Sequence, residues 1–198
     1  MELLANTLRP TKLKDIIGQT HLVGKDAVLS NLVKNKHLFS MILWGKPGTG
    51  KTSIANAIVN ELKHPYRMLN ATINNKSDFD IVIEEAKMEG EMILIMDEIH
   101  RLNKDKQDLL LPHIESGLIT LIGMTTSNPY YSINPAIRSR VQIFELKDLT
   151  SEDIKKGLKR AIKNLPNIKI NDTALSYIAE LSNGDFRNAA LEKLRKLK

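Results

Sequence analysis

Cysteine is absent from the 198-residue sequence, which excludes disulfide bonds and thiolate metal sites. Aromatic residues are few, at 5%, and no apolar run approaches the roughly 18 residues of a membrane-spanning helix. The N-terminal stretch MELLANTLRPTKLKD lacks the basic-then-apolar layout of a signal peptide. We therefore expect a cytoplasmic protein with no membrane partner.

The charge balance leans to the basic side, with a formal net charge of +6. Such an excess permits attraction to nucleic acid but does not require it. Most of the basic residues are lysines within helical segments such as EDIKKGLKRAIK and LEKLRKLK, a pattern typical of solvated helix faces. Charge alone therefore leaves DNA binding open.

Short apolar segments rich in β-formers alternate with segments of helical periodicity, as in KTSIANAIVNELK and DFDIVIEEAKM. This alternation predicts an α/β fold in which a parallel sheet carries helices on its faces. The five predicted strands are residues 40–44, 66–69, 92–96, 119–124 and 142–146.

The pattern becomes helical after Leu149. Helix caps are predicted at Thr150 or Ser151 and at Asn171, a terminator at Asn183 and Gly184, and a third helix near Asp185. We therefore expect an α/β domain over residues 1–148 and a small helical lid over 149–198. The final stretch LEKLRKLK has no terminating residue, so we expect this lid to be truncated.

The segment GKPGTGKTS follows a predicted strand and opens a predicted helix, which is the context of a phosphate-binding P-loop. Its glycines let backbone N–H groups converge on phosphate, Lys51 reaches the β- and γ-phosphates, and the Thr52 hydroxyl suits Mg²⁺. The predicted ATP- or ADP-binding residues of this loop are Gly45, Lys46, Pro47, Gly48, Thr49, Gly50, Lys51, Thr52 and Ser53.

The segment MILIMDEIH delivers Asp97 and Glu98 at the carboxyl end of an apolar strand, where open α/β sheets bind ligands. Asp97 suits the Mg²⁺ shell, and Glu98 can polarise a water for attack on the γ-phosphate. A kinase must protect its γ-phosphate from water, so the free carboxylate favours an ATPase over a P-loop kinase.

Polar residues also end the predicted strand that lies between the P-loop strand and the strand of Asp97. Thr125, Thr126 and Asn128 could each hydrogen-bond the attacking water or the phosphate, although Ser-Asn-Pro is also ordinary turn chemistry. The five histidines, His100 among them, lack metal-ligand spacing, and we assign them no chemical role.

Taken together, LRPTKLKDIIGQTHLVG, SMILWGKPGTGKTS, DEIHRLNKDKQDLLLPHIESGLITLIGMTTSNP, INPAIRSR and NGDFRNAAL resemble the RarA (MgsA) family of replication-associated recombination proteins. These are AAA+ ATPases of the clamp-loader branch. The resemblance covers nearly the whole chain and implies a P-loop NTPase fold with a five-stranded parallel sheet and a helical lid.

The resemblance implies further site residues. Thr126 corresponds to sensor 1, Arg187 to sensor 2 on the lid, and Arg140 to an arginine finger that completes a neighbouring subunit's site. We therefore expect Arg140 to have no partner in its own chain. Asn70 matches a residue that restrains the catalytic glutamate in related ATPases. The residues expected near the adenine are Arg9, Pro10, Ile17 and Gly18.

Two residues depart from the family pattern. Lys46 replaces the usual proline of the loop, and Arg138 has no counterpart, so we expect Arg138 to be a solvated charge. RuvB-type motors share DEIHRL but carry a DNA-engaging hairpin insertion before sensor 1, whereas here Gly117 runs almost directly into a strand. Bacterial clamp-loader motor subunits carry a cysteine zinc module, whereas this sequence has no cysteine.

The main hypothesis is an Mg²⁺-dependent, homo-oligomeric ATPase that remodels DNA at stalled replication forks, binds forked or junction DNA, and associates with the nucleoid. A single-stranded DNA-binding protein is a candidate partner. The alternatives are a nucleotide switch whose ATP or ADP state controls partner association, a RuvB-like or clamp-loader-like subunit, and a P-loop kinase.

Overall fold

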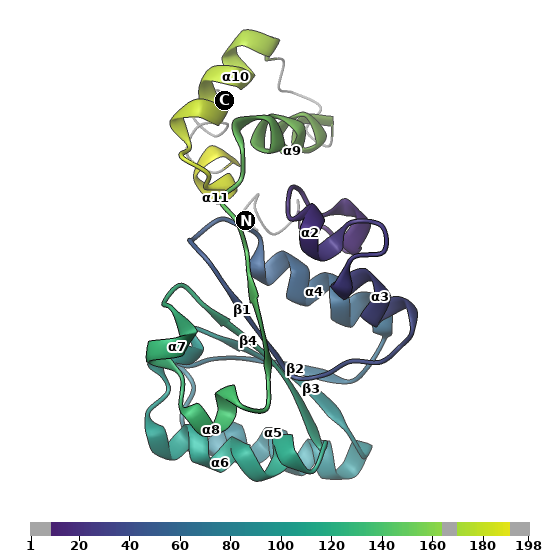
Figure 1. Cartoon of the computed structure of the whole chain (residues 1–198), viewed down its shortest axis with the longest axis vertical. Helices are drawn as coiled ribbons and strands as arrows, with labels where there is room; N and C mark the ends of the chain where they lie inside the picture. Colours follow the sequence, from purple (N-terminus) through teal and green to yellow (C-terminus); the bar gives the residue numbers. More distant parts are fainter. Residues whose placement is uncertain (1–8, 164–169, 191–198) are drawn as a thin grey trace.

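The computed structural model describes residues 9–163 and 170–190. A five-stranded sheet forms its centre, with helices on both faces and a helical lid, α9–α11, at one end (Figure 1). The strands run in the order β2-β3-β4-β1-β5, and every pairing is parallel. The predicted α/β fold is confirmed.

The strands match the predicted apolar segments to within a residue at each end. They are β1 (Met41–Trp44), β2 (Tyr66–Asn70), β3 (Met92–Asp97), β4 (Ile119–Thr125) and β5 (Gln142–Glu145). Strands β3, β4 and β1 lie inside the sheet and are buried on both faces, which is why they are nearly continuous apolar runs. Strand β4 lies between β3 and β1, as predicted.

The helices form two layers. On one face lie η1 (Leu13–Asp15), α2 (Thr20–Val23), α3 (Val28–Lys34) and α4 (Lys51–Leu62); on the other lie α5 (Lys76–Glu89) and α6 (Lys104–Glu115), with η2 (Ile99–Arg101), α7 (Pro129–Ser132) and α8 (Pro135–Arg138) beside them. Each layer packs its own apolar cluster against the sheet, so the two clusters hold the strands from both sides.

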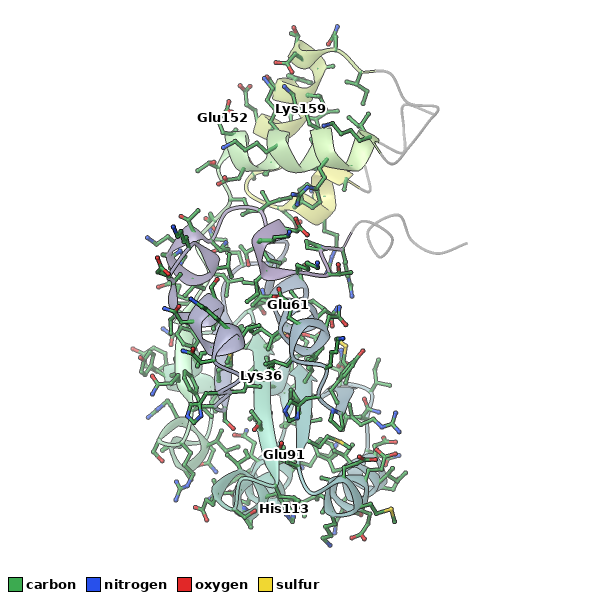
Figure 2. The ribbon with its side chains drawn as sticks, turned by 90° about the vertical axis from the view of Figure 1, so that its right-hand side faces the viewer. Lys36, Glu61, Glu91, His113, Glu152 and Lys159 are labelled. Atoms are coloured by element: carbon green, nitrogen blue, oxygen red, sulfur yellow. The ribbon has the colours of Figure 1, made fainter. Side chains whose placement is uncertain are left out.

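The lid consists of α9 (Ser151–Lys163), α10 (Asp172–Leu181) and α11 (Phe186–Asn188). A third apolar cluster, from Leu149 to Ala189, holds these helices together. Figure 2 shows Glu152 and Lys159 of the lid at one end of the molecule and His113 of α6 at the other. The stretch LEKLRKLK lies outside the described residues.

Helices α9 and α10 begin at predicted caps, and α10 ends before the predicted terminator. The Thr150 hydroxyl accepts from the Asp153 N–H at 3.1 Å, and the Asn171 side chain accepts from the Ala174 N–H at 2.8 Å, so both residues are N-caps. Asn183 and Gly184 take left-handed backbone conformations after α10, with φ of 48° and 80°. In the described part of the chain, no helix is long and apolar enough to cross a membrane.

Candidate active site

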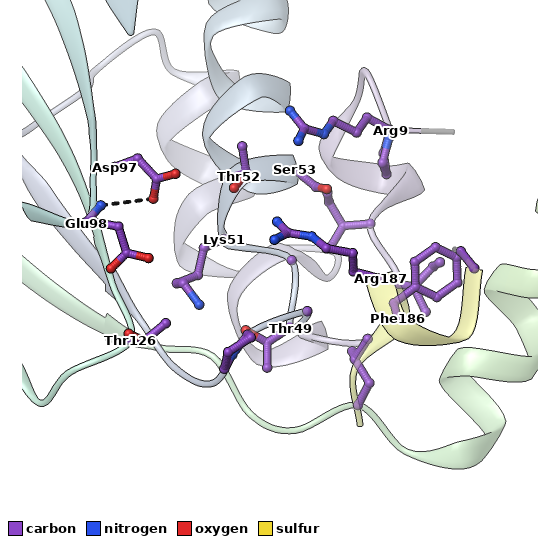
Figure 3. A pocket seen from close by; sticks show the side chains of 18 residues that line it. Arg9, Thr49, Lys51, Thr52, Ser53, Asp97, Glu98, Thr126, Phe186 and Arg187 are labelled. Atoms are coloured by element: carbon purple, nitrogen blue, oxygen red, sulfur yellow. Dashed lines mark hydrogen bonds between the residues drawn. The ribbon is translucent and has the colours of Figure 1, made fainter. Parts of the chain in front are cut away.

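One pocket lies at the carboxyl ends of β1, β3 and β4, beneath the lid (Figure 3). It brings together the P-loop, the end of β3, the end of β4, the N-terminal segment and α11, which are far apart in the sequence. The residues that line it are Arg9, Pro10, Ile16, Ile17, Pro47, Gly48, Thr49, Gly50, Lys51, Thr52, Ser53, Asp97, Glu98, Thr126, Leu149, Phe186, Arg187 and Ala190.

The P-loop wraps around the ammonium group of Lys51. Gly48 and Gly50 have φ of 75° and 108°, conformations that glycine adopts most readily, and α4 begins directly after Gly50. The Lys51 Nζ donates to the carbonyl oxygens of Gly45 and Lys46, each at 2.8 Å. Burial lowers the pKa of Lys51, and the nearby carboxylates of Glu98 and Asp97 oppose that shift. A bound triphosphate would give this partly buried cation a far stronger anionic partner.

Strand β3 ends in the two carboxylates predicted from the sequence. The Glu98 N–H donates to the Asp97 Oδ1 at 3.0 Å (Figure 3). Glu98 has a left-handed backbone, with φ of 52°, which is uncommon for a non-glycine residue and turns the chain sharply out of the strand. Both side chains reach the same pocket as Lys51.

The hard oxygen donors of Asp97 and Thr52 fit the needs of Mg²⁺, which binds few protein ligands and completes its shell with phosphate and water. Among the described residues there is no group of three or more histidine, cysteine or acidic side chains that could hold a metal unaided. The donor set therefore suits a metal that arrives with a nucleotide.

The polar residues at the end of β4 have separate surroundings. Thr126 is exposed and lines the pocket, whereas Thr125 is buried, with its hydroxyl 3.0 Å from the His100 Nδ1. Asn128 is not among the lining residues. Its side chain accepts from the Tyr130 N–H at 2.9 Å and caps α7, so the turn chemistry of Ser-Asn-Pro determines its position.

Two guanidinium groups face the pocket, one from each end of the chain. Arg9 comes from the N-terminal segment and Arg187 from α11 of the lid (Figure 3). Burial lowers the pKa of Arg9, and the nearby charge of Arg187 lowers it further. Two cations that disfavour each other in one pocket indicate an anionic ligand, because an anion placed there would stabilise both.

The apolar end of the pocket includes residues that the sequence analysis missed. Pro10 and Ile17 line it as expected, and they are joined by Ile16, Leu149, Phe186 and Ala190. Gly18 is not among the lining residues, and a Cβ there would stand 2.6 Å from the Leu149 side chain. Phe186 precedes Arg187 in GDFR, and this adjacency to a predicted site residue could have indicated that Phe186 lies at the pocket.

A buried glutamine, also missed, ties the P-loop to the end of the sheet. The Gln19 Nε2 donates to the carbonyl oxygens of Thr49, at 3.2 Å, and Lys147, at 2.7 Å, while its Oε1 accepts from the Lys147 N–H at 3.0 Å. Gln19 is only 5% exposed; its bond to Thr49 is buried, and its bonds to Lys147 are partly buried. They fix the loop against the segment that leads into the lid.

The lid also presses directly on the P-loop at Gly48. A Cβ at Gly48 would lie 1.9 Å from the Asp185 Oδ1 and 2.8 Å from its Cα. We expect Gly48→Ala to weaken binding of a fluorescent ATP analogue and to lower the melting temperature, because the lid must move away. Left-handed strain alone costs about 1–2 kcal/mol.

Gly117 offers a matched control for this substitution. Its φ of 77° is close to the 75° of Gly48, but an added Cβ would meet nothing within 4 Å. Gly117→Ala should therefore lower the melting temperature through backbone strain but leave the binding of the ATP analogue unchanged. Equal losses of nucleotide affinity in the two variants would contradict a contact between the lid and the loop.

The structure corrects the expectation that Arg140 has no partner in its own chain. Its guanidinium forms an ion pair with Glu115, the last residue of α6, and donates to the Ala136 carbonyl oxygen at 2.7 Å. Both charged groups are substantially exposed, and such pairs typically contribute only about 0–1 kcal/mol. Arg140 does not line its own pocket, so a stronger anion elsewhere could take it from Glu115.

The other two unusual cations also have partners. Arg138 is half-buried, donates to the Tyr130 carbonyl oxygen, and lies over the Tyr130 ring at 5.7 Å, so it is less solvated than expected. Lys46 is exposed and forms an ion pair with Asp148 at 2.5 Å. Its charge is therefore turned from the loop toward the start of the lid.

Asn70, expected near Glu98, uses its amide oxygen to accept from the N–H and hydroxyl of Thr72, at 2.9 and 2.6 Å. The side chain found beside the Glu98 carboxylate is that of His100. Metal-ligand spacing does not detect a histidine that contacts a carboxylate, so no chemical role was predicted for His100.

A phosphate-binding loop, a strand ending in Asp-Glu and a lid arginine in one pocket define a P-loop ATPase. The family model for the "ATPase family associated with various cellular activities (AAA)" matches residues 41–149, and the chain belongs to this family.

Comparison with known proteins also confirms the resemblance inferred from the sequence. The chain is 54% identical to replication-associated recombination protein A of Bacillus subtilis, over 96% of this chain and 46% of that protein. It is 40% identical to the protein of that name from Escherichia coli, over 94% and 44%. The chain thus spans about half the length of these curated relatives.

Among solved structures, the chain is similar to the Holliday junction branch migration motor RuvB of Thermotoga maritima. The TM-score is 0.80 at 32% identity, over 92% of this chain and 63% of that one. Only residues 116–118 separate α6 from β4 here, which leaves no room for a hairpin insertion before sensor 1.

Proposed function

We propose that the chain is the ATP-hydrolysing core of an oligomeric protein that remodels DNA in replication-fork maintenance and recombination. The observation that carries the proposal is the convergence of Lys51, Glu98, Thr126 and Arg187 on one pocket, while Arg140 lies outside it. Four of the five polar groups expected for hydrolysis thus come from one subunit.

The proposed reaction begins with the triphosphate held by the P-loop amides and Lys51. Thr52 and Asp97 would hold Mg²⁺, which would supply positive charge to stabilise the phosphates. Glu98 would accept a proton from the attacking water while the water oxygen bonds to the γ-phosphorus. The bond between the γ-phosphorus and the oxygen that bridges it to the β-phosphate then breaks. Thr126 and Arg187 would hydrogen-bond the γ-phosphate, and the products are ADP and phosphate.

Completion of the site in trans is part of the proposal. Arg140 of one subunit would leave Glu115 and stabilise the charge on the γ-phosphate of a neighbour, as arginine fingers do. Its absence from its own pocket supports this role, and so does the exposure of its ion pair.

The boundary between the ATPase domain and the lid is proposed at residues 148 and 149. The third apolar cluster begins at Leu149 and draws on lid residues, whereas the cluster of the sheet ends at Leu146. The connecting residues therefore belong to neither core.

The DNA-related part of the proposal is supported by the names of the curated relatives and by the net charge of +6. Association with the nucleoid and with a single-stranded DNA-binding protein would follow from the same role. Forked DNA is the substrate that we expect to matter most.

We expect forked DNA to raise the ATP turnover of the protein at its natural length several-fold above turnover without DNA. Duplex DNA without a junction is the matched control, and released phosphate is the measurement. A very slow rate that no DNA changes would favour the nucleotide switch. Phosphate found on a small acceptor instead of in solution would favour a kinase.

A further inference from the structure

His100 links the catalytic carboxylate to the end of β4. It lies on η2, directly after Glu98 and Ile99, and its side chain is only 11% exposed. Its Nδ1 is 3.0 Å from the Thr125 Oγ1 and 3.4 Å from the Glu98 Oε2. One ring nitrogen therefore faces two oxygen atoms that come from different strands.

The oxygen atoms around this nitrogen favour a proton on it. A carboxylate can only accept, so the contact with Glu98 needs an N–H at Nδ1. The Thr125 Oγ1 already accepts from the Ser127 N–H at 3.0 Å, and its own proton can go to the Ser127 carbonyl oxygen at 3.2 Å. With its proton on Nδ1, His100 can donate to the Thr125 Oγ1 at 3.0 Å while the same N–H faces the Glu98 carboxylate at 3.4 Å.

No other side chain in the described part of the chain forms a hydrogen bond or ion pair with the Glu98 carboxylate. The Asn70 amide oxygen accepts from Thr72, and the bonds found among the described residues include none from the Asn70 amide nitrogen to Glu98. Glu98 itself has a left-handed backbone and lines the pocket with a side chain that is 35% exposed. Without His100, the carboxylate would be free to adopt other rotamers.

We propose that His100 is the positioning residue of the catalytic glutamate and that it couples this glutamate to the sensor threonine. Thr125 is fixed to His100, and the next residue, Thr126, lines the nucleotide pocket. Movement of the β4 end against a γ-phosphate would turn the Nδ1–H of His100 from one acceptor oxygen, on Thr125, toward the other, on Glu98. The orientation of Glu98 then depends on whether the γ-phosphate is present. This inference rests on the proposed ATPase function.

The test compares two substitutions of His100 in the protein at its natural length. His100→Phe keeps a ring but removes the donor, and His100→Asn places an N–H near the position of Nδ1. We expect His100→Phe to lower kcat about 10- to 100-fold, the range that one hydrogen bond to a charged group supplies. The affinity for ATP should stay within about threefold, and His100→Asn should restore most of kcat.

A double-mutant cycle with Thr125→Val tests the coupling. If His100 acts between Thr125 and Glu98, the effects of His100→Phe and Thr125→Val on kcat should fall well short of additive. Additive effects would overturn the coupling. Loss of ATP affinity together with kcat, without rescue by His100→Asn, would overturn the positioning role and indicate a structural one.

Comparing the wild-type protein with Glu98→Gln shows whether a wrong role for His100 or a wrong ATPase function explains a negative result. If the wild type releases phosphate no faster than Glu98→Gln, the proposed ATPase function fails. If the wild type is active and His100→Phe matches its kcat, only the role of His100 fails.

Discussion

Glu98→Gln should bind ATP as tightly as the wild type and fail to hydrolyse it. Glutamine has nearly the shape of glutamate but cannot accept a proton from water, and loss of a general base typically lowers a rate by about 10² to 10⁴. Glu98 follows β3, whereas the groups proposed to bind phosphate are on the P-loop, so the substitution leaves those groups in place.

Lys51→Ala should have the opposite effect to Glu98→Gln, because it should abolish ATP binding itself. It removes the ammonium around which the P-loop is built, and with it the hydrogen bonds to Gly45 and Lys46. We expect loss of ATP binding, measured with a fluorescent analogue, and hence loss of turnover. Equal loss of binding in both variants would contradict the role given to Glu98.

Arg140→Ala should lower ATP turnover of the oligomer by about 10³ to 10⁵, the typical contribution of an arginine finger. Nucleotide affinity should change little, because Arg140 does not line its own pocket. Arg138→Ala is the control: it removes a neighbouring cation that contacts Tyr130, and turnover should stay within a few-fold of wild type.

Mixing variants tests whether Arg140 acts in trans. Subunits with Arg140→Ala retain Glu98, and subunits with Glu98→Gln retain Arg140, so some interfaces of a mixed oligomer are complete. Turnover should partly recover in the mixture although each variant alone is inactive. A variant carrying both substitutions, mixed with Glu98→Gln, must show no recovery. Brisk turnover by demonstrably monomeric wild-type protein would also contradict action in trans.

The sheet and the position of the P-loop between β1 and α4 were predictable because their signals are local. A strand such as β3 is an apolar run of fixed length, and the P-loop needs particular residues at particular spacings. The caps at Thr150 and Asn171 were equally readable, because a cap depends on residues three positions apart.

The contacts that escaped prediction join distant parts of the chain or depend on one side-chain rotamer. Arg140 meets Glu115 only because α6 ends beside the turn that follows α8, and no pattern along the chain reports that proximity. His100 is close to Glu98 in sequence. The role proposed for His100 depends on its contact with Thr125, which lies beside His100 because β3 and β4 are paired.

The side chain of Gln19 has a mechanical consequence. It holds the backbone of Thr49 in the P-loop and that of Lys147, two residues before Leu149 opens the lid. Displacing one of these two backbone segments alone would break hydrogen bonds made by a buried side chain. Gln19 therefore links movement of the P-loop mechanically to the residues at the base of the lid.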